Sequence, residues 1–304
     1  MDLQPAQLAA LVAIADTGSF EAAARALSVT PSAVSQRIRA LESAAGQVLV
    51  RRTAPCAPTR AGERLVRLGR ETSLLWAEAR EELSASGAVV ELRVAVNADS
   101  LATWFGGVLS AVGGWPGVAL RLDVEDQATS TDLLRRGEAL AAVTSDPVAV
   151  QGCTVGPLGV LRYRPAASPA FAERWVRAGR ADWAAMPVVV FNEKDALQDD
   201  LLAARGHPRP PVVHRVPTSA DFHQAVRRGL GWGLVPEPQL GPDLASGRLV
   251  LLAAGDRPGR DRVDVALHWQ RWRLDSPLLG RLSDVVRSEA AAALRPLARP
   301  HHPL

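Results

Sequence analysis

Apolar residues recur at helical spacing in three short runs near the amino terminus, and polar positions separate these runs. The first run, within residues 5–15, predicts a helix with one apolar face. Ser19 stands where it can cap a second helix, and Pro31 stands at the first position of a third, where its missing N–H costs no hydrogen bond. Residues 18–42 are therefore predicted to form two short helices joined by a tight turn.

The third predicted helix has two distinct faces. Val34, Ile38 and Leu41 fall at i, i+4 and i+7, so their face is expected to be buried. The opposite face carries hydroxyl, amide and guanidinium groups, from Ser32, Ser35, Gln36, Arg37 and Arg39. An ordinary helical hairpin with a solvated polar face gives a similar pattern. Residues 18–70, however, hold nine arginines against three acidic residues, which favours a DNA-reading helix-turn-helix.

A long amphipathic pattern follows, from about residue 59 to residue 83. Its apolar positions recur at intervals of three and four and form one narrow seam, made of Leu65, Leu68, Thr72, Leu75, Ala79 and Leu83. Such a seam fits a helix packed on its own domain, or one that pairs with a second copy. The position between a basic head and a separate region favours a dimerisation helix.

From residue 91 onward, short apolar runs alternate with helical patterns. This alternation predicts an α/β fold with parallel strands and helices on both faces of the sheets. The predicted strands are 92–96, 118–124, 139–144, 158–163, 188–191, 212–216, 232–235, 249–252 and 263–269. The predicted helices are 100–112, 129–136, 170–178, 197–205, 219–229 and 277–294.

Composition narrows the class of protein. A chain of 304 residues, 47% of them hydrophobic, is long enough for two or three domains with sizeable cores. No stretch approaches the roughly 18 apolar residues of a membrane span, and the first residues lack the charged and apolar regions of a signal peptide. Two cysteines provide neither a disulfide framework nor a metal cluster. We therefore expect a cytoplasmic protein without cofactor or metal.

The helix-turn-helix region contains one ungapped motif, formed by Phe20, Ala23, Ala24, Leu27, Val29, Thr30, Ser32–Ser35, Ile38, Leu41, Glu42, Gly46, Pro58, Thr59, Ala61 and Gly62. This motif resembles the signature of the LysR-type transcriptional regulators. The resemblance implies a winged helix-turn-helix, a linker helix and a two-lobed effector domain like a periplasmic binding protein. The implied DNA-binding domain is 1–58, the linker helix 59–87, the effector domain 88–295 and the tail 296–304. Lobe I covers about 88–163 and 265–295, and lobe II about 164–264.

The wing departs from the usual family pattern, because Val48–Arg51 replaces the common Leu-Phe pair. This departure resembles the branch that senses arginine and lysine, the ArgP and LysG regulators of basic amino-acid export. Further matches to that branch extend over nearly the whole chain, at 96–100, 102–105, 125–127, 197–199, 229–233, 269–270 and 274–277.

Three junctions between a strand and the following segment are candidates for a ligand site, because ligands collect at the carboxyl ends of strands in open α/β sheets. Their hydroxyls and exposed N–H groups suit a carboxylate; the hydroxyls belong to Ser100, Thr144, Thr218 and Ser219. Simple helix capping explains many serines and threonines at such places equally well.

Acidic residues gather at the same junctions and suit the side-chain cation of a basic amino acid. They are Asp99, Asp126, Asp146 and Asp199, with Glu193 and Asp195 nearby. Solvated loop carboxylates are the plainer alternative. Trp104 and Trp232 are candidate pocket walls, although an aromatic residue after a strand more often packs in the core.

No catalytic motif is present, so we expect a regulator and not an enzyme. The expected base contacts come from Ser32, Ala33, Ser35, Gln36 and Arg37, and the expected phosphate contacts from Thr30, Arg39, Arg51 and Arg52. The predicted partners are a promoter inverted repeat in double-stranded DNA, a homodimer or homotetramer partner, and L-lysine or L-arginine; RNA polymerase is a further candidate.

Two alternatives to that function remain open. One is a ligand-independent architectural DNA binder, or an inhibitor of replication initiation, which needs the same head and no working pocket. The other is a LysR-type regulator with a different small-metabolite effector.

Overall fold

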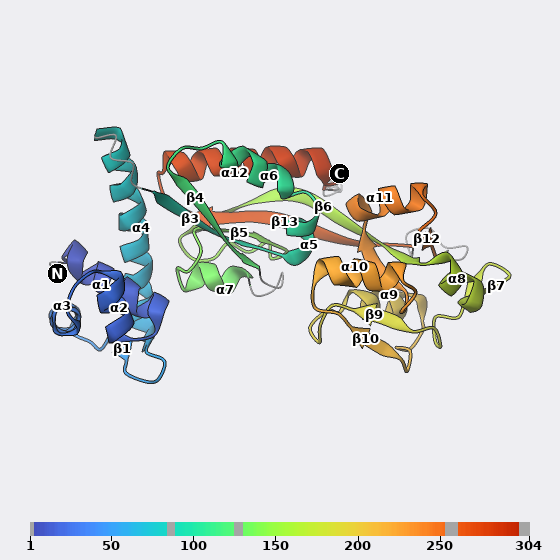
Figure 1. Ribbon diagram of the computed structural model, residues 1–304, viewed down its shortest axis with the longest axis horizontal. Coiled ribbons are helices and arrows are strands. Elements are labelled where there is room, and N and C mark those ends of the chain that lie inside the picture. Colours follow the sequence, from blue (N-terminus) through green and yellow to red (C-terminus); the bar gives the residue numbers. More distant parts are fainter. Residues whose placement is uncertain (1–2, 84–88, 125–129, 253–260, 298–304) are drawn as a thin grey trace, which may run out of the picture.

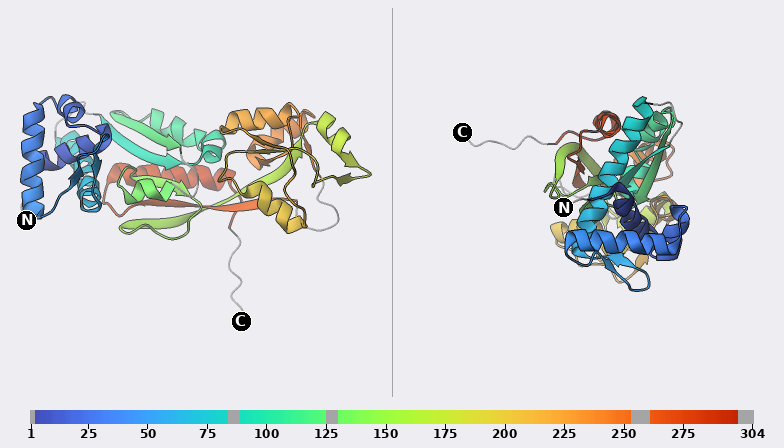
Figure 2. Two further views of the ribbon diagram at one scale, coloured as in Figure 1. Left: turned by 90° about the horizontal axis from the view of Figure 1, so that it is seen from below. Right: turned by 90° about the vertical axis from the view of Figure 1, so that its left-hand side faces the viewer.

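The computed structural model describes residues 3–83, 89–124, 130–252 and 261–297, and it is elongated. A small helical head lies at one end, a first lobe in the middle and a second lobe at the other end (Figure 1). The left view of Figure 2, turned by 90° about the horizontal axis, shows the same order of parts. The predicted hinge at 84–87, Asp126 and most of the predicted tail lie outside the described residues.

The head contains α1 (Pro5–Thr17), α2 (Phe20–Ala26) and α3 (Pro31–Ala45), followed by the wing strands β1 (Val50–Arg51) and β2 (Ala57–Pro58). The predicted caps are confirmed: the hydroxyl of Ser19 accepts the N–H of Ala22, and Pro31 opens α3. Leu11, Ile38 and Leu41 are fully buried in the core that the three helices share.

The linker helix α4 (Arg60–Leu83) joins the head to the first lobe. Its first half packs on α1, where Leu65 and Leu68 border the core of the head. Gly62 is required here, because a Cβ atom at this position would lie 2.1 Å from the carbonyl oxygen of Leu49. Further along the helix, Leu74 is buried against the first lobe, whereas Leu75 and Trp76 are exposed.

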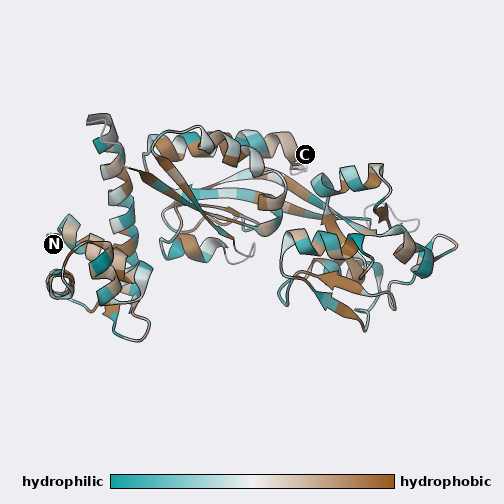
Figure 3. Cartoon of the chain, viewed as in Figure 1, coloured by the Kyte–Doolittle hydropathy of each residue, from teal (hydrophilic) through white to brown (hydrophobic). Residues whose placement is uncertain are grey.

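The first lobe is built on the strands β3 (Val90–Val96), β4 (Val118–Val124) and β5 (Ala141–Thr144). β3 pairs in parallel with β4 on one side and with β5 on the other, as the alternating pattern predicted. The helices α5 (Ala98–Ala102), α6 (Gly106–Gly113), α7 (Ser130–Arg135) and α12 (Pro277–Ala293) surround them. Hydrophilic and hydrophobic residues alternate along α4, α10 and α12, as expected for helices with one packed face (Figure 3).

Two long strands connect the lobes, β6 (Cys153–Ala167) and β13 (Val263–Trp272). They pair antiparallel with each other, and β13 also pairs antiparallel with β5. The prediction of purely parallel sheets was therefore wrong for these strands. The sequence pattern shows the strands but not their direction, and a chain that crosses between lobes twice returns in the opposite sense.

The second lobe holds α8 (Pro169–Trp175), α9 (Leu197–Arg205), α10 (Ser219–Arg227) and α11 (Glu237–Ala245), with the short strands β7 (Val176–Arg177) and β8 (Arg180–Ala181). Its sheet strands are β9 (Val188–Val190) and β10 (Val213–Arg215), which pair in parallel, and β11 (Gly233–Pro236) and β12 (Val250–Leu251), which join β6.

Three helical predictions need correction. The helix expected over 170–178 ends at Trp175, and the next two residues form β7. The single helix expected over 100–112 is divided into α5 and α6, because Thr103 leaves the helical conformation between them. Helix α11 was not predicted, since Pro238 and Pro242 in its sequence are typical of a loop. In the part of the chain that the structure describes, no helix is both long and apolar enough to cross a membrane.

Candidate functional site

The polar face of α3 is open to solvent on the side opposite its buried residues. Val34 and Ile38 have no exposed surface, whereas Ser32, Gln36 and Arg39 are exposed. Ala33, Ser35 and Arg37 are partly exposed beside them. The structure therefore gathers the predicted base-contacting residues on one surface of the head.

Thr30 lies at the start of this surface and caps α3. Its hydroxyl oxygen accepts the N–H of Ala33 at 3.2 Å and lies 3.0 Å from the hydroxyl of Ser32. Arg51 and Arg52 are exposed in the wing, and the guanidinium of Arg52 lies 5.2 Å from the centre of the Phe20 ring. This wing cation is therefore held against an aromatic ring of the head while it remains exposed.

A cavity of about 250 Å³ lies where α5 of the first lobe approaches α9 and α10 of the second. This space suits a small metabolite. Its polar lining side chains are Asn97, Asp99, Ser145, Tyr163, Asn192, Lys194, Asp195, Gln198, Asp200 and Gln239. Three carboxylates and a single cation give this lining an acidic character.

Asp99 joins three elements at the cavity. The hydroxyl of Tyr163, on the crossing strand β6, donates to Asp99 Oδ2 at 2.8 Å, and the hydroxyl of Ser219, at the start of α10, donates to Asp99 Oδ1 at 2.9 Å. Burial raises the pKa of the Asp99 carboxyl above its usual value, and the two hydrogen bonds oppose that rise only in part. Asp99 therefore connects the two lobes and meets the cavity with a carboxyl group that is costly to ionise without a cation.

Asp195 is the second partly buried carboxyl group of the cavity. It accepts the N–H of Phe191 at 2.9 Å and the N–H of Leu197 at 3.2 Å, which fixes it at the start of α9. Burial again raises its pKa. Asp200, on the same helix, is exposed at the lining.

Of the predicted effector residues that the structure describes, only Asp99 is part of the cavity lining itself. Ser219 reaches the lining through its bond to Asp99. Thr144 is buried, and its hydroxyl accepts the N–H of Asp146 at 3.0 Å. The hydroxyl of Thr218 caps α10 and donates to Asp221 at 2.6 Å. Ser100 is fully buried behind the lining.

The other predicted residues in the described ranges do not belong to the cavity lining. Asp146 accepts the N–H of Val148 in its own loop, and Asp199 pairs with Arg209 at 3.3 Å. Trp104 and Trp232 are buried, and their rings pack edge-on against Phe105 and Trp183, respectively. Both tryptophans are thus core residues of their lobes, as the plainer interpretation had it.

Sequence reasoning missed several lining residues. Tyr163 is 1% exposed and sits within a long strand, so its pattern indicated only core. Asn97 and Gln198 belong to segments that the sequence indicates as candidate junctions or helices, but their amides were not among the predicted ligand groups. Lys194 was noticeable as the only lysine of the chain. Its neighbour Asp195 had been named among the nearby acids.

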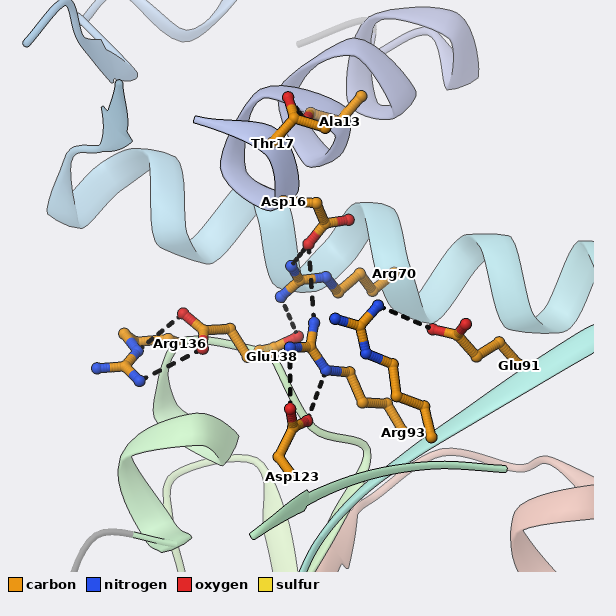
Figure 4. Close-up of polar contacts among 11 residues, drawn as sticks. Ala13, Asp16, Thr17, Arg70, Glu91, Arg93, Asp123, Arg136 and Glu138 are labelled. Atoms are coloured by element: carbon orange, nitrogen blue, oxygen red, sulfur yellow. Dashed lines mark hydrogen bonds and ion pairs between the residues drawn. The ribbon is translucent and has the colours of Figure 1, made fainter. Parts of the chain in front are cut away.

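A polar junction connects the head, the linker helix and the first lobe (Figure 4). Arg70 of α4 binds Asp16 at the end of α1 and donates to the carbonyl oxygen of Gly137 in the first lobe at 2.5 Å. Arg93 of β3 lies 3.8 Å from the same Asp16 carboxylate and donates to Asp123 of β4 at 2.7 Å. One carboxylate of the head therefore meets cations from both the linker helix and the effector domain.

The linker helix has two further attachments to the first lobe. Arg67 donates to the carbonyl oxygens of Gln151 and Gly152 at 2.7 and 3.1 Å. Glu78 accepts from the hydroxyl of Ser276 at 2.6 Å and from the N–H of Leu278 at 3.1 Å, at the start of α12. These bonds attach α4 to the first lobe at two separate points along the helix.

Comparison with known families assigns both parts of the chain. Residues 5–63 match the bacterial regulatory helix-turn-helix of the lysR family, and residues 85–291 match the LysR substrate binding domain. The lysine export transcriptional regulatory protein LysG of Corynebacterium glutamicum is 47% identical over 298 residues, which cover 97% of this chain and 100% of that protein.

Two solved structures are similar over nearly the full length. Full-length LysG of C. glutamicum with bound effector Arg has a TM-score of 0.80 at 45% identity and covers 96% of this chain and 100% of its own. ArgP of Mycobacterium tuberculosis has a TM-score of 0.85 at 44% identity and covers 97% of this chain and 100% of its own.

Proposed function

The chain belongs to the LysR family of transcriptional regulators, and on that premise we propose that it binds promoter DNA through its head and L-arginine or L-lysine through the cavity between its lobes. Its function is regulation and not catalysis. The target that this assignment favours is a gene for basic amino-acid export or related metabolism, because the similar LysG is a lysine export regulator.

The observation that carries the effector assignment is the acidic cavity between the lobes. Asp99, Asp195 and Asp200 surround a space of about 250 Å³, and the first two carboxyl groups have raised pKa values that a bound cation would relieve. A ligand with an extra positive charge is favoured over a neutral or acidic amino acid by this arrangement. Charge complementarity of this kind contributes to the choice between ligands more than to total affinity.

Calorimetry with L-arginine, L-lysine, L-glutamate and L-leucine tests the assignment. We expect heat of binding with the two basic amino acids alone. A protein that binds none of the four would support the architectural DNA binder, and one that binds glutamate or leucine instead would support a different metabolite effector.

The DNA-reading surface is proposed to act as part of a dimer or a dimer of dimers on an inverted repeat, since one recognition helix contacts few bases. The exposed Leu75 and Trp76 on α4 support pairing through the linker helix. Residues Thr30, Arg39, Arg51 and Arg52 are assigned to phosphates, and the α3 residues 32, 33 and 35–37 to base edges. A regulator with these partners would act in the cytoplasm.

Two substitutions are expected to separate base reading from phosphate binding. Gln36→Ala removes an amide that can pair with a base edge, and we expect it to relax specificity by about 1–3 kcal/mol at one position of the operator. Arg52→Ala removes a phosphate partner and should weaken binding to operator and random DNA alike, with a smaller salt slope. Titrations of both variants with operator DNA and with random DNA measure these changes in affinity. If both variants lost the same affinity on both DNAs, the assignment of Gln36 to bases and Arg52 to phosphates would be refuted.

The polar junction is proposed to carry the effector signal to the head. Arg70→Met removes the guanidinium that joins Asp16 to the first lobe and keeps much of the apolar stem. We expect this variant to bind L-arginine with unchanged affinity and to lose most of the arginine-dependent change in operator affinity. Arg135→Met, which removes an exposed pair with Asp132, is the matched control and should respond like the unaltered protein. An unaltered response in Arg70→Met would exclude this route of coupling.

A further inference from the structure

Two buried amide oxygens at the cavity lack a hydrogen-bond partner. Asn97 is 3% exposed and Gln198 is 2% exposed, and neither Asn97 Oδ1 nor Gln198 Oε1 has a partner among the residues that the structure describes. Both residues line the cavity. A buried acceptor without a donor is costly, so paired lining acceptors of this kind indicate a ligand that supplies N–H groups.

The two amides come from opposite lobes. Asn97 precedes α5 of the first lobe, and Gln198 lies in the first turn of α9 in the second lobe. The Nε2 group of Gln198 donates to the carbonyl oxygen of Val189 at 3.3 Å, which leaves its oxygen as the free acceptor. A ligand that donates to both amides would therefore join the lobes.

Three of the four hydroxyls that the sequence suggested for the ligand carboxylate already have other bonds. Thr144 accepts a backbone N–H, Thr218 donates to Asp221, and Ser219 donates to Asp99. The fourth, Ser100 Oγ, has no partner among the described residues, but it is fully buried and Ser100 does not line the cavity. A carboxylate needs a positive partner in an otherwise acidic cavity. Lys194 is the only cationic side chain among the lining residues of this cavity.

Lys194 is exposed at the lining, in the loop that leads into α9. Asn192 Oδ1 accepts the N–H groups of Lys194 and Asp195 at 2.8 and 3.1 Å, so the backbone of this loop is held in place while the lysine side chain extends from it. In the described part of the chain, no ion pair involves this lysine.

From this arrangement we infer the orientation of the effector: its α-carboxylate binds Lys194, and its N–H groups bind the amide oxygens of Asn97 and Gln198. The inference rests on the proposed function and deepens it, since it assigns the residues that choose a free amino acid over other cations. Lys194 selects for the carboxylate, and the amide pair selects for the donor groups.

Paired ligands test the role of Lys194. L-arginine and agmatine share the guanidinium and the amine, and agmatine lacks the carboxylate. We expect Lys194→Met to weaken the binding of L-arginine by roughly tenfold and the binding of agmatine by less than about twofold. Lys194→Arg should retain most of the affinity for L-arginine. Equal losses for the two ligands in Lys194→Met would overturn the assignment. If the unaltered protein bound neither L-arginine nor L-lysine, the proposed function itself would fail.

For the amide oxygens of Asn97 and Gln198, the expected result differs from that for Lys194, because both test ligands should be affected. Gln198→Met removes the acceptor oxygen and keeps a side chain of similar volume. We expect it to weaken the binding of L-arginine and of agmatine by the same factor, because both ligands carry the N–H groups that would donate to Gln198. Gln198→Glu keeps an acceptor and should retain binding of both. Unchanged affinities in Gln198→Met would overturn this half of the inference.

The single lysine also permits a direct measurement. Reductive methylation with ¹³C-formaldehyde keeps the positive charge and labels only Lys194 and the amino terminus, since the sequence holds no other lysine. We expect L-arginine to shift the methyl signal of Lys194 in an NMR spectrum and agmatine to shift it far less. A lysine signal that L-arginine leaves unmoved would contradict a contact with the carboxylate.

Discussion

Replacing Asp99 with asparagine is expected to weaken the binding of L-arginine and L-lysine by about 100-fold, which corresponds to about 3 kcal/mol. The substitution keeps the size of the side chain and allows bonds to Tyr163 and Ser219, but it removes a carboxylate from an acidic cavity. The cation of the ligand would then lose its partner while it remained desolvated. Calorimetry of the variant measures the loss.

The pH dependence of binding offers an independent check. Burial raises the pKa of Asp99 and of Asp195. Each carboxyl group therefore stays protonated in a fraction of the molecules at pH values where an exposed aspartate is fully ionised. A cationic ligand binds the ionised form, and its affinity should therefore rise with pH until both groups have ionised. In Asp99→Asn this rise should be smaller, because one of the two titrating groups is absent.

Stability should change with pH in the opposite sense. An acid with a higher pKa in the folded state binds more protons there than in the unfolded chain, so its ionisation opposes folding. The contribution of Asp99 to the free energy of unfolding thus falls as pH rises from about 4, the pKa of an aspartate in the unfolded chain, through the raised pKa of Asp99 in the folded protein. Without ligand, Asp99→Asn should be at least as stable at neutral pH as the unaltered protein.

The exposed Asp132→Asn substitution is the matched control for charge. Asp132 pairs with Arg135 on the surface of the first lobe, outside the cavity lining. We expect its arginine affinity and pH profile to match those of the unaltered protein. If Asp99→Asn behaved like this control, Asp99 would not contact the effector.

The strands and most helices could be predicted because local periodicity records which face of each element is buried. The head was predictable to within a few residues, since Ser19 and Pro31 determine where its helices begin. Helix α11 was not, because its packing against β11 and β6 outweighs the poor helix propensity of its prolines.

The cavity was predictable only in part. The rule that polar residues after a strand face a ligand identified Asp99 and Ser219, which do meet at the cavity. The same rule selected Asp146 and Asp199, whose carboxylates turn to Val148 and Arg209. Side-chain direction depends on bonds within each loop, and a one-dimensional pattern does not contain that information.

Long-range polar contacts were the least predictable feature. Asp243 of α11 is the clearest case, because its side chain is 4% exposed and meets three cationic or basic groups, two on α10 and one in the segment before β12. Arg248 lies 2.7 Å from it, His223 lies 2.8 Å and Arg227 lies 3.4 Å. Burial alone would raise the pKa of Asp243, but the hydrogen bond from Arg248 and the nearby charges together lower it.

Asp243→Asn is therefore expected to destabilise the second lobe by about 3 kcal/mol, because it leaves two arginines facing a neutral amide in a buried site. Part of this stability in the unaltered protein should disappear in acid. A carboxyl group with a lowered folded pKa stabilises the fold above about pH 4 and loses that contribution as pH falls through the folded value. The variant should lack this acid-dependent component.

Thermal unfolding of Asp243→Asn beside Asp284→Asn distinguishes a buried network from surface charge. Asp284 pairs with Arg287, but its side chain is 82% exposed, so its removal should cost less than about 0.5 kcal/mol. For a chain of this size, about 3 kcal/mol corresponds to a midpoint lower by about 6–12 °C. Equal midpoints for the two variants would mean that Asp243 contributes no more than an exposed ion pair. A selective loss in Asp243→Asn would mean that α10, α11 and the segment before β12 form one unit around this carboxylate, which supports the cavity from behind.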